Sequence, residues 1–402
     1  MSYLIPPAGA PISFREILKI TSSWLRCDLC TEMFEEKIRS HAKVKYWYFF
    51  NSGRTAQVFI LKALSQIADP SKDEVVIPAY TCFSVAAAIA RSGLKIRLVD
   101  IDPLTMDYNY ERLFSLNFTR VLAVIACNLF GILSNWEKLW SIAKEKNIFL
   151  IDDAAQSMGT LFKGRPSGTL GDVGFYSLNR GKNLSTYSGG ILLTDDDEIA
   201  ARIQEDIQNL NRPNFSSEIA ALIKMTLYSW FLRPKLYWLP SMIPFLGLGK
   251  TVFDETFSLG HLTCFQKCAG AILWNNLENL NTARAKNSQR LAEELLKLGR
   301  FEIPGYNEAF CPTYLRLPLL AQNRVWHERA IAALRQQGVV GSTMYPSTIR
   351  QIDGIEKYLA SPTGDFPGAQ EVVEKLLTLP THSYLKHNDI QKIVFCLREN
   401  KM

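Results

Sequence analysis

The stretch TRVLAVIACNLFGILSNWEKLWSIAKEKNIFLIDDAAQSMG, residues 119–159, decides the fold class. It opens with an apolar run, continues with helical periodicity over 135–147, and closes with a second apolar run that leads into Asp152 and Asp153. Apolar runs without alternation are typical of strands buried on both faces, which occur in parallel sheets with helical connections. The stretch therefore predicts a strand–helix–strand unit of a parallel sheet.

The same alternation continues on both sides of this unit. The patterns predict a helix over 54–67, a strand over 73–80, a helix over 84–93, and strands over 94–102, 171–178 and 189–196. We therefore expect an α/β fold with a mostly parallel central sheet flanked by helices. Ligands of such sheets bind beyond the carboxyl ends of the strands. The polar residues expected at those ends are Tyr80 to Cys82, Asn128, Asp153 and Gln156.

The pattern changes after residue 260. The expected elements there are a long helix over 265–298, strands over 314–321 and 339–346, and helices over 325–338 and 388–399. This order indicates a smaller α+β domain. We divide the chain into an N-terminal helical segment (1–44), a large α/β domain (45–257) and a small α+β domain (258–402).

Composition excludes several classes of protein. The chain has 402 residues and a net charge of +6, without a basic stripe interleaved with aromatic residues, so we expect no nucleic-acid partner. The N-terminal residues lack the pattern of a signal peptide. The eight cysteines show no framework spacing, which favours a reducing compartment and a cytoplasmic location.

Two cysteine pairs suggest an alternative. Cys27 and Cys30 lie in a helix-like stretch, and Cys264 and Cys268 are one helical turn apart, near His261. Together these residues could ligate zinc. Free cysteines are usually small core residues, so we expect no metal.

The segment 221–249 is rich in aromatic and aliphatic residues. Its uncharged run, 236–249, is shorter than the roughly 20 residues that a spanning helix needs. We interpret the segment as a buried insertion or subunit contact. The alternative is an interfacial membrane segment, because Trp, Tyr and basic residues favour the headgroup level.

The candidate chemistry centres on Asp153 and Lys182. Lys182 follows Asp153 by one further predicted strand, so both are expected at neighbouring strand ends. A lysine amine and a carboxylate suit pyridoxal phosphate: the amine attacks the aldehyde, and the carboxylate keeps the pyridine nitrogen protonated. Ser177 and the SGRT turn, residues 52–55 before a helix, offer donors for the phosphate.

The chain resembles the DegT/StrS-type sugar aminotransferases, a branch of the fold-type-I pyridoxal phosphate enzymes. The matching stretches are NSGRTA, DEVVIPAYTC, LVDIDPLTMDYN, LIDDAAQSMG, GTLGDVGFYSLNRGKNL and SGGILLTDD. The resemblance implies that Lys182 forms the Schiff base, that Asp153 pairs with the pyridine nitrogen, and that Gln156 lies beside the ring. It also implies that Ser177 and the turn of Ser52, Gly53, Arg54 and Thr55 hold the phosphate.

The resemblance further implies a homodimer and transfer of an amino group, from glutamate, to a nucleotide-linked keto sugar in polysaccharide, O-antigen or glycoconjugate biosynthesis. Several positions depart from the family pattern. Cys82 stands where an aromatic residue commonly stacks on the ring, so Tyr80 or Phe83 could substitute. Ser188 replaces a frequent Glu, Asn128 a frequent His, and Leu262 an Asn that relatives supply from the partner subunit.

Three alternatives stay open. The first is another fold-type-I enzyme, such as a desulfurase or a decarboxylase. The second is a catalytically silent relative that keeps the fold. The third is a membrane-associated enzyme that acts on a lipid-linked precursor, which the segment 221–249 motivates.

Overall fold

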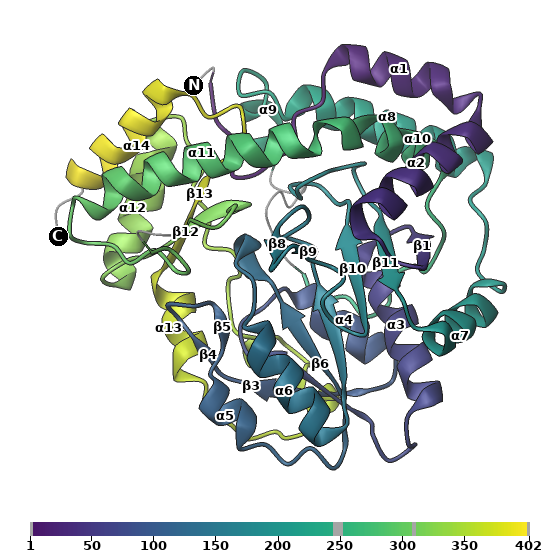
Figure 1. Cartoon of the computed structure of the whole chain (residues 1–402). Coiled ribbons are helices and arrows are strands. Elements are labelled where there is room, and N and C mark those ends of the chain that lie inside the picture. The colour runs from purple at the N-terminus through teal and green to yellow at the C-terminus, as the bar shows by residue number, and fades with distance from the viewer. Residues whose placement is uncertain (1–2, 244–251, 308–310, 400–402) are drawn as a thin grey trace.

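A seven-stranded sheet forms the centre of the computed structural model, which describes residues 3–243, 252–307 and 311–399 (Figure 1). The strand order is β1-β11-β10-β7-β6-β2-β3. Their bounds are β1 Tyr46–Phe50, β2 Glu74–Pro78, β3 Lys95–Val99, β6 Val121–Cys127, β7 Phe149–Asp153, β10 Val173–Ser177 and β11 Gly190–Thr194. β11 runs antiparallel to both β1 and β10, and the other neighbours are parallel. The predicted mostly parallel α/β sheet is confirmed.

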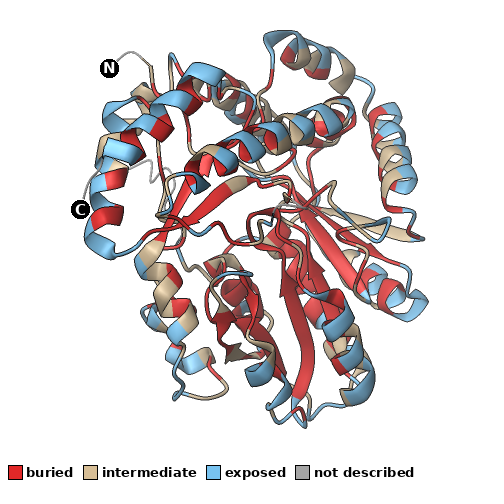
Figure 2. Cartoon of the chain, turned by 60° about the vertical axis from the view of Figure 1, so that its left-hand side comes forward, coloured by how far each residue is buried: buried red, intermediate tan, exposed pale blue. Residues whose placement is uncertain are grey.

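The strand–helix–strand unit expected over residues 119–159 has the predicted form. β6 and β7 pair in parallel with Ile125 opposite Ile151, and every residue of β6 is buried. Their connection, α6 (Trp136–Lys146), is capped by the Asn135 side chain, which accepts a hydrogen bond from the Lys138 backbone N–H. It ends at Asn147 in the left-handed region. Figure 2 shows the buried strands between helices whose outer faces are exposed.

The remaining elements of the large domain surround this sheet. Its helices are α3 (Gly53–Ile67), α4 (Phe83–Arg91), α5 (Tyr110–Phe114), α7 (Asp197–Ile207), α8 (Phe215–Phe231) and α9 (Trp238–Ser241). Its short elements are β4 (Ile101–Asp102), β5 (Asp107–Tyr108), η1 (Leu129–Gly131), β8 (Leu161–Phe162) and β9 (Arg165–Pro166).

The C-terminal part contains helices around a two-stranded sheet. Its elements are α10 (Cys264–Leu273), η3 (Trp274–Asn276), α11 (Leu277–Leu296), β12 (Arg316–Leu320), α12 (Arg324–Gln336), η4 (Ile349–Gln351), η5 (Glu356–Tyr358), α13 (Pro367–Lys375), β13 (Leu376–Pro380) and α14 (His387–Glu399). The predicted long helix over 265–298 is interrupted by η3. The strand predicted over 339–346 was wrong: these residues form only isolated bridges, and β12 pairs with β13 instead.

The N-terminal residues also differ from the helix-like stretch expected around Cys27. The chain breaks after α1 (Phe14–Trp24), and α2 (Cys27–Ala42) starts a new helix that packs against α10. This packing joins Cys27 to Cys264 in a disulfide, which the sequence patterns did not predict when they indicated a reducing compartment. Spacing alone did not reveal the pair, because 237 residues separate its members.

The other six cysteines are free. Within the described ranges, no group of three or more His, Cys, Asp or Glu side chains could hold a metal ion. The zinc alternative therefore has no geometric support in this part of the chain.

The segment 221–249 is only partly covered by the rest of the protein. Residues 244–249 lie outside the described residues. In the described part, several large apolar side chains of α8 and the α9 region are exposed, so this part is not an insertion buried within its own chain, and the subunit contact named beside it stays a prediction. None of the described helices is long and apolar enough to cross a bilayer. The domain limits 1–44, 45–257 and 258–402 remain a proposal.

Candidate active site

A cavity of about 920 Å³ lies at the carboxyl ends of the central strands. It gathers residues from the ends of β6, β7 and β10, the start of α3 and the loop before β11. Of the residues predicted for the site, those that line it are Ser52, Gly53, Arg54, Cys82, Asp153, Gln156, Ser177 and Lys182. Thr55 does not, because its buried hydroxyl donates to Asn51 Oδ1 at 2.6 Å.

Asp153 is the last residue of β7 and faces the cavity. Burial raises the pKa of its carboxyl to about 6, while a hydrogen bond from the Ala155 backbone N–H (3.0 Å) and the nearby charge of Lys182 act in the opposite direction. A buried carboxylate with so few donors is a good partner for a cationic N–H, which would offset the cost of its charge.

Asp152 is turned away from the cavity. Its carboxylate accepts from the backbone N–H groups of Gly168 (2.6 Å) and Leu170 (3.1 Å) and from Asn128 Nδ2 (2.8 Å). Burial raises its pKa to about 7, and these three donors lower it. Asn128 also donates to the Asp153 backbone oxygen at 3.0 Å, so it fixes the end of the strand that presents Asp153.

Asp152→Asn is therefore expected to reduce stability. The new amide group must face one of three donors, which leaves buried polar atoms unpaired and costs about 2–4 kcal/mol. Chemical denaturation of the cofactor-free variant measures the loss. An unchanged free energy of unfolding would show that these bonds contribute nothing net.

Lys182 lies in the loop between β10 and β11. Burial lowers the pKa of its amine, and the nearby Cys82 and Asp153 raise it. The loop is held from behind by the buried Arg284 of α11, whose Nη2 donates to the backbone oxygens of Lys182 (3.3 Å) and Gly9 (3.1 Å). Tyr228 of α8 supports it from another side, since its hydroxyl accepts from the Gly181 N–H at 3.4 Å.

The start of α3 forms an anion site against the end of β10. Ser52 caps the helix by accepting from the Thr55 N–H at 3.1 Å, and this leaves the first-turn N–H groups of Gly53 and Arg54 available. A Cβ on Gly53 would lie 3.2 Å from Ser177 Cβ, so glycine allows the close approach of helix and strand. Arg54 instead pairs with Asp254 (3.7 Å) and lies over the Phe257 ring.

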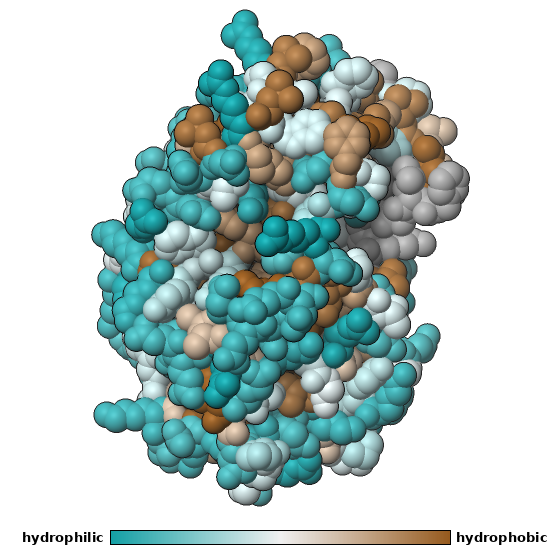
Figure 3. Space-filling model, turned by 90° about the vertical axis from the view of Figure 1, so that its right-hand side faces the viewer, coloured by the Kyte–Doolittle hydropathy of each residue, from teal (hydrophilic) through white to brown (hydrophobic). Residues whose placement is uncertain are grey.

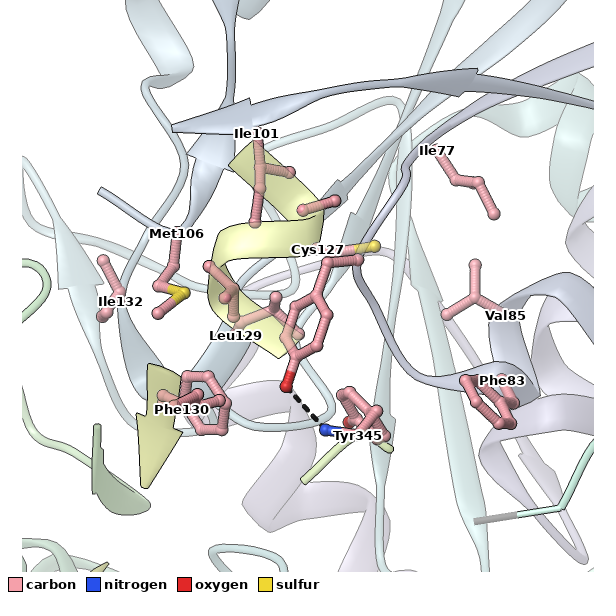
Figure 4. Packing of buried hydrophobic residues seen from close by; sticks show 14 of the residues in the cluster. Ile77, Phe83, Val85, Ile101, Met106, Cys127, Leu129, Phe130, Ile132 and Tyr345 are labelled. Carbon is pink, nitrogen blue, oxygen red and sulfur yellow. Dashed lines mark hydrogen bonds between the residues drawn. The ribbon is translucent and has the colours of Figure 1, made fainter. Parts of the chain in front are cut away.

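Gln156 joins the cavity to the small domain. Its Oε1 accepts from the Phe130 N–H at 3.3 Å, and its Nε2 donates to the Tyr345 hydroxyl at 3.2 Å. Tyr80 and Phe83, considered above as ring-stacking residues, point into the core instead. Tyr80 bonds the Tyr345 backbone N–H at 2.6 Å, and Phe83 stacks on the Tyr345 ring (Figure 4). Cys82, the N-cap residue of α4, lines the cavity, whereas Tyr80 and Phe83 do not.

Two residues that depart from the family pattern, Ser188 and Leu262, make contacts within their own chain. Ser188 lines the cavity and receives a hydrogen bond from Gln266 Nε2 at 2.9 Å. Leu262 is buried within its own chain, next to Gly189.

Sequence reasoning missed most of the positive charge of the cavity. Its lining includes five basic side chains and one acidic side chain, Asp153. The basic residues are Arg54, Arg180, Lys182, Arg212 and Lys224. Arg180 adjoins the predicted lysine and could have been inferred from it. Arg212 and Lys224 carry no sequence signal, because they reach the site only through the placement of α8.

These residues fit pyridoxal phosphate. Lys182 can hold the aldehyde carbon, Asp153 can hold the ring N–H, and the α3 N-terminus with Ser52 and Ser177 can hold the phosphate. The sheet and this site define the chain as a fold-type-I enzyme that depends on pyridoxal phosphate.

Comparison with known proteins specifies the family. The model of the DegT/DnrJ/EryC1/StrS aminotransferase family matches residues 13–398, and the chain belongs to this family. It is 33% identical over 368 residues to the UDP-2-acetamido-2-deoxy-3-oxo-D-glucuronate aminotransferase of Pseudomonas aeruginosa, with 90% of this chain and 88% of that protein covered.

Two solved structures share the fold. A putative sugar aminotransferase from Streptococcus pneumoniae in its PMP form superposes with a TM-score of 0.78 at 19% identity, with 99% of this chain and 98% of that chain covered. An Escherichia coli GDP-4-keto-6-deoxy-D-mannose-3-dehydratase with bound hydrated PLP has a TM-score of 0.76, also at 19% identity, with coverage of 98% and 99%. The chain is a pyridoxal-phosphate-dependent aminotransferase by its family.

Proposed function

We propose that the protein transfers an amino group, from glutamate, to a keto sugar linked to a nucleotide diphosphate, in the biosynthesis of a polysaccharide, O-antigen or other glycoconjugate. The observation that carries this proposal is the single cavity that combines Lys182, Asp153 and an excess of cationic side chains. Similar proteins that act on nucleotide sugars, such as the Pseudomonas aeruginosa aminotransferase, support it.

The residues have distinct roles in this proposal. Bound pyridoxal phosphate supplies an electron-accepting ring that stabilises negative charge on the substrate carbon. Lys182 Nζ would take the proton from that carbon and deliver it to the carbon of the cofactor's former aldehyde group, and the lowered pKa of its amine keeps a neutral fraction available as a base. Asp153 holds the ring N–H, and Ser52, Gly53 and Ser177 orient the phosphate.

The cavity charge supports an anionic substrate. Arg180, Arg212 and Lys224 line the cavity together with polar residues such as Asn211 and Asn214. A diphosphate brings two negative charges, and several cationic donors can bind it through charge-assisted hydrogen bonds. The sugar would then extend inward toward Lys182.

Lys182 also supports transamination over dehydration, since the family resemblance implies that dehydratases replace this lysine. Exposure of the protein to glutamate should therefore convert the cofactor to its amine form, and a nucleotide-linked keto sugar should restore the aldehyde form. Absorbance spectra follow both half-reactions. The proposal fails if glutamate changes the spectrum and no keto sugar with a diphosphate group reverses it.

The proposal also covers the oligomeric state of the protein and its cellular compartment. We propose a homodimer, as the resemblance to the family implies. Sedimentation measurements test it. A cytoplasmic location is supported by the six free cysteines, although the Cys27–Cys264 bond calls for a thiol count on freshly isolated protein.

A further inference from the structure

The outer side of α8 carries an exposed apolar stripe. Ile223, Leu227 and Trp230 are exposed by 52%, 46% and 45%, and their spacing of four and three residues places them on one side of the helix. The α9 region adds Leu239 and Met242, exposed by 39% and 68%. We call these five residues the α8–α9 surface. Hydrophobic side chains gather at the upper end of the molecule in Figure 3, where α1 and α8 lie in Figure 1.

The charge around this surface has one sign. Residues 219–253 contain no Asp or Glu, but they contain Lys224, Arg233, Lys235 and Lys250. Of the first three, which the structure describes, none takes part in an ion pair with another described residue.

The acids that flank this segment are already engaged. Glu218 accepts from the first backbone N–H groups of α10, at Cys264 (2.7 Å) and Phe265 (2.8 Å). Asp254 pairs with Arg54 and Thr256. The positive charge beside the apolar stripe is therefore not neutralised by its neighbours in the sequence.

A second copy of the chain is a poor occupant for this surface. A two-fold contact sets the same patch against itself, so the lysines of two copies would meet without any acid of the segment between them. An anionic lipid surface suits both the exposed apolar side chains and the positive charge beside them. It accepts apolar side chains below the headgroups, places Trp at headgroup level, and pairs its phosphates with Lys and Arg.

The same helix reaches the catalytic cavity. Ser217, Ala220, Ala221 and Lys224 of α8 line the cavity on the side adjacent to the apolar stripe. The helix that carries the apolar stripe therefore also forms part of the cavity wall. We propose that the α8–α9 surface docks on an anionic lipid bilayer, so that this wall of the cavity lies near headgroup level. This docking goes beyond the proposed transamination and does not depend on it.

Sedimentation of the full-length protein with lipid vesicles tests the docking. Vesicles of phosphatidylcholine alone are compared with vesicles that also contain phosphatidylglycerol. We expect binding to the anionic vesicles that weakens with added salt, because screening reduces the attraction of the lysines. Leu227→Ser with Trp230→Ser should weaken binding at least about tenfold. Lys235→Gln should weaken it about fivefold.

The matched control is Val325→Ser with Phe395→Ser, which removes two side chains of the small domain exposed by 59% and 60%. It should bind vesicles as the wild type does. Lys182→Ala should also bind normally, so failure of the enzymatic proposal leaves the docking testable. Thermal melting confirms that each variant is folded.

Two results would overturn the docking. One is wild-type protein that stays in the supernatant with anionic vesicles. The other is a Leu227→Ser, Trp230→Ser variant that binds vesicles normally but sediments alone as a smaller species, since the surface would then be a subunit contact.

Discussion

Lys182→Ala is expected to lower turnover by at least about 10³-fold, because the variant loses both the proton carrier and the amine that holds the cofactor. The loss of covalent attachment can be measured separately. Borohydride reduction followed by denaturation should leave the cofactor on the wild-type peptide that contains Lys182 and on no peptide of the variant. Mass spectrometry of the digest distinguishes the two.

The control for this substitution is Lys392→Ala, which removes an exposed lysine of α14. It should retain wild-type turnover and labelling. A small primary amine added to the Lys182→Ala protein should restore part of the rate, because it can replace the missing base. Labelling at another lysine, or turnover that survives the substitution, would contradict the assignment.

Asp153→Asn should have opposite effects on catalysis and on stability. An amide cannot balance the charge of the ring N–H, and loss of one member of a buried charge pair costs about 3–5 kcal/mol. We therefore expect turnover to fall on the order of 10²- to 10³-fold. Steady-state kinetics with the same donor and acceptor measure the change.

The cofactor-free variant should be more stable than the wild type at pH 8. Burial raises the pKa of Asp153 to about 6, above its value in the unfolded chain, so the folded state prefers the neutral carboxyl. The wild type therefore loses stability as the pH rises from about 4 to about 6, by about 3 kcal/mol from this group. The Asn variant should lack this loss. Denaturation at pH 4 and pH 8 tests the difference, and an equal pH dependence in both proteins would contradict it.

The sheet was predictable because its strands are apolar runs that parallel packing requires. Residues 119–159 became β6, α6 and β7 close to the expected limits, and the polar residues that follow the strands reached one cavity. This success rests on local patterns. A strand end fixes the position of the residue next to it, as with Asp153 and Ser177.

The parts that depend on long-range packing were not predictable. A strand was expected over 339–346, whereas those residues form only isolated bridges and β12 pairs with β13, which the sequence patterns did not predict. Lys224 reaches the cavity through the placement of α8, and Thr55 misses it because its buried hydroxyl is bonded to Asn51. Periodicity does not report such orientations.

The hydrogen bond from Arg284 to the Lys182 backbone oxygen has a consequence for the order of folding. The donor lies 102 residues after the loop that it holds. During synthesis the strands of the large sheet can therefore form while the lysine loop still lacks its support. The newly made chain becomes able to capture its cofactor only after α11 has emerged and docked. The residues that bind the cofactor come early in the chain, but competence to use it is acquired late.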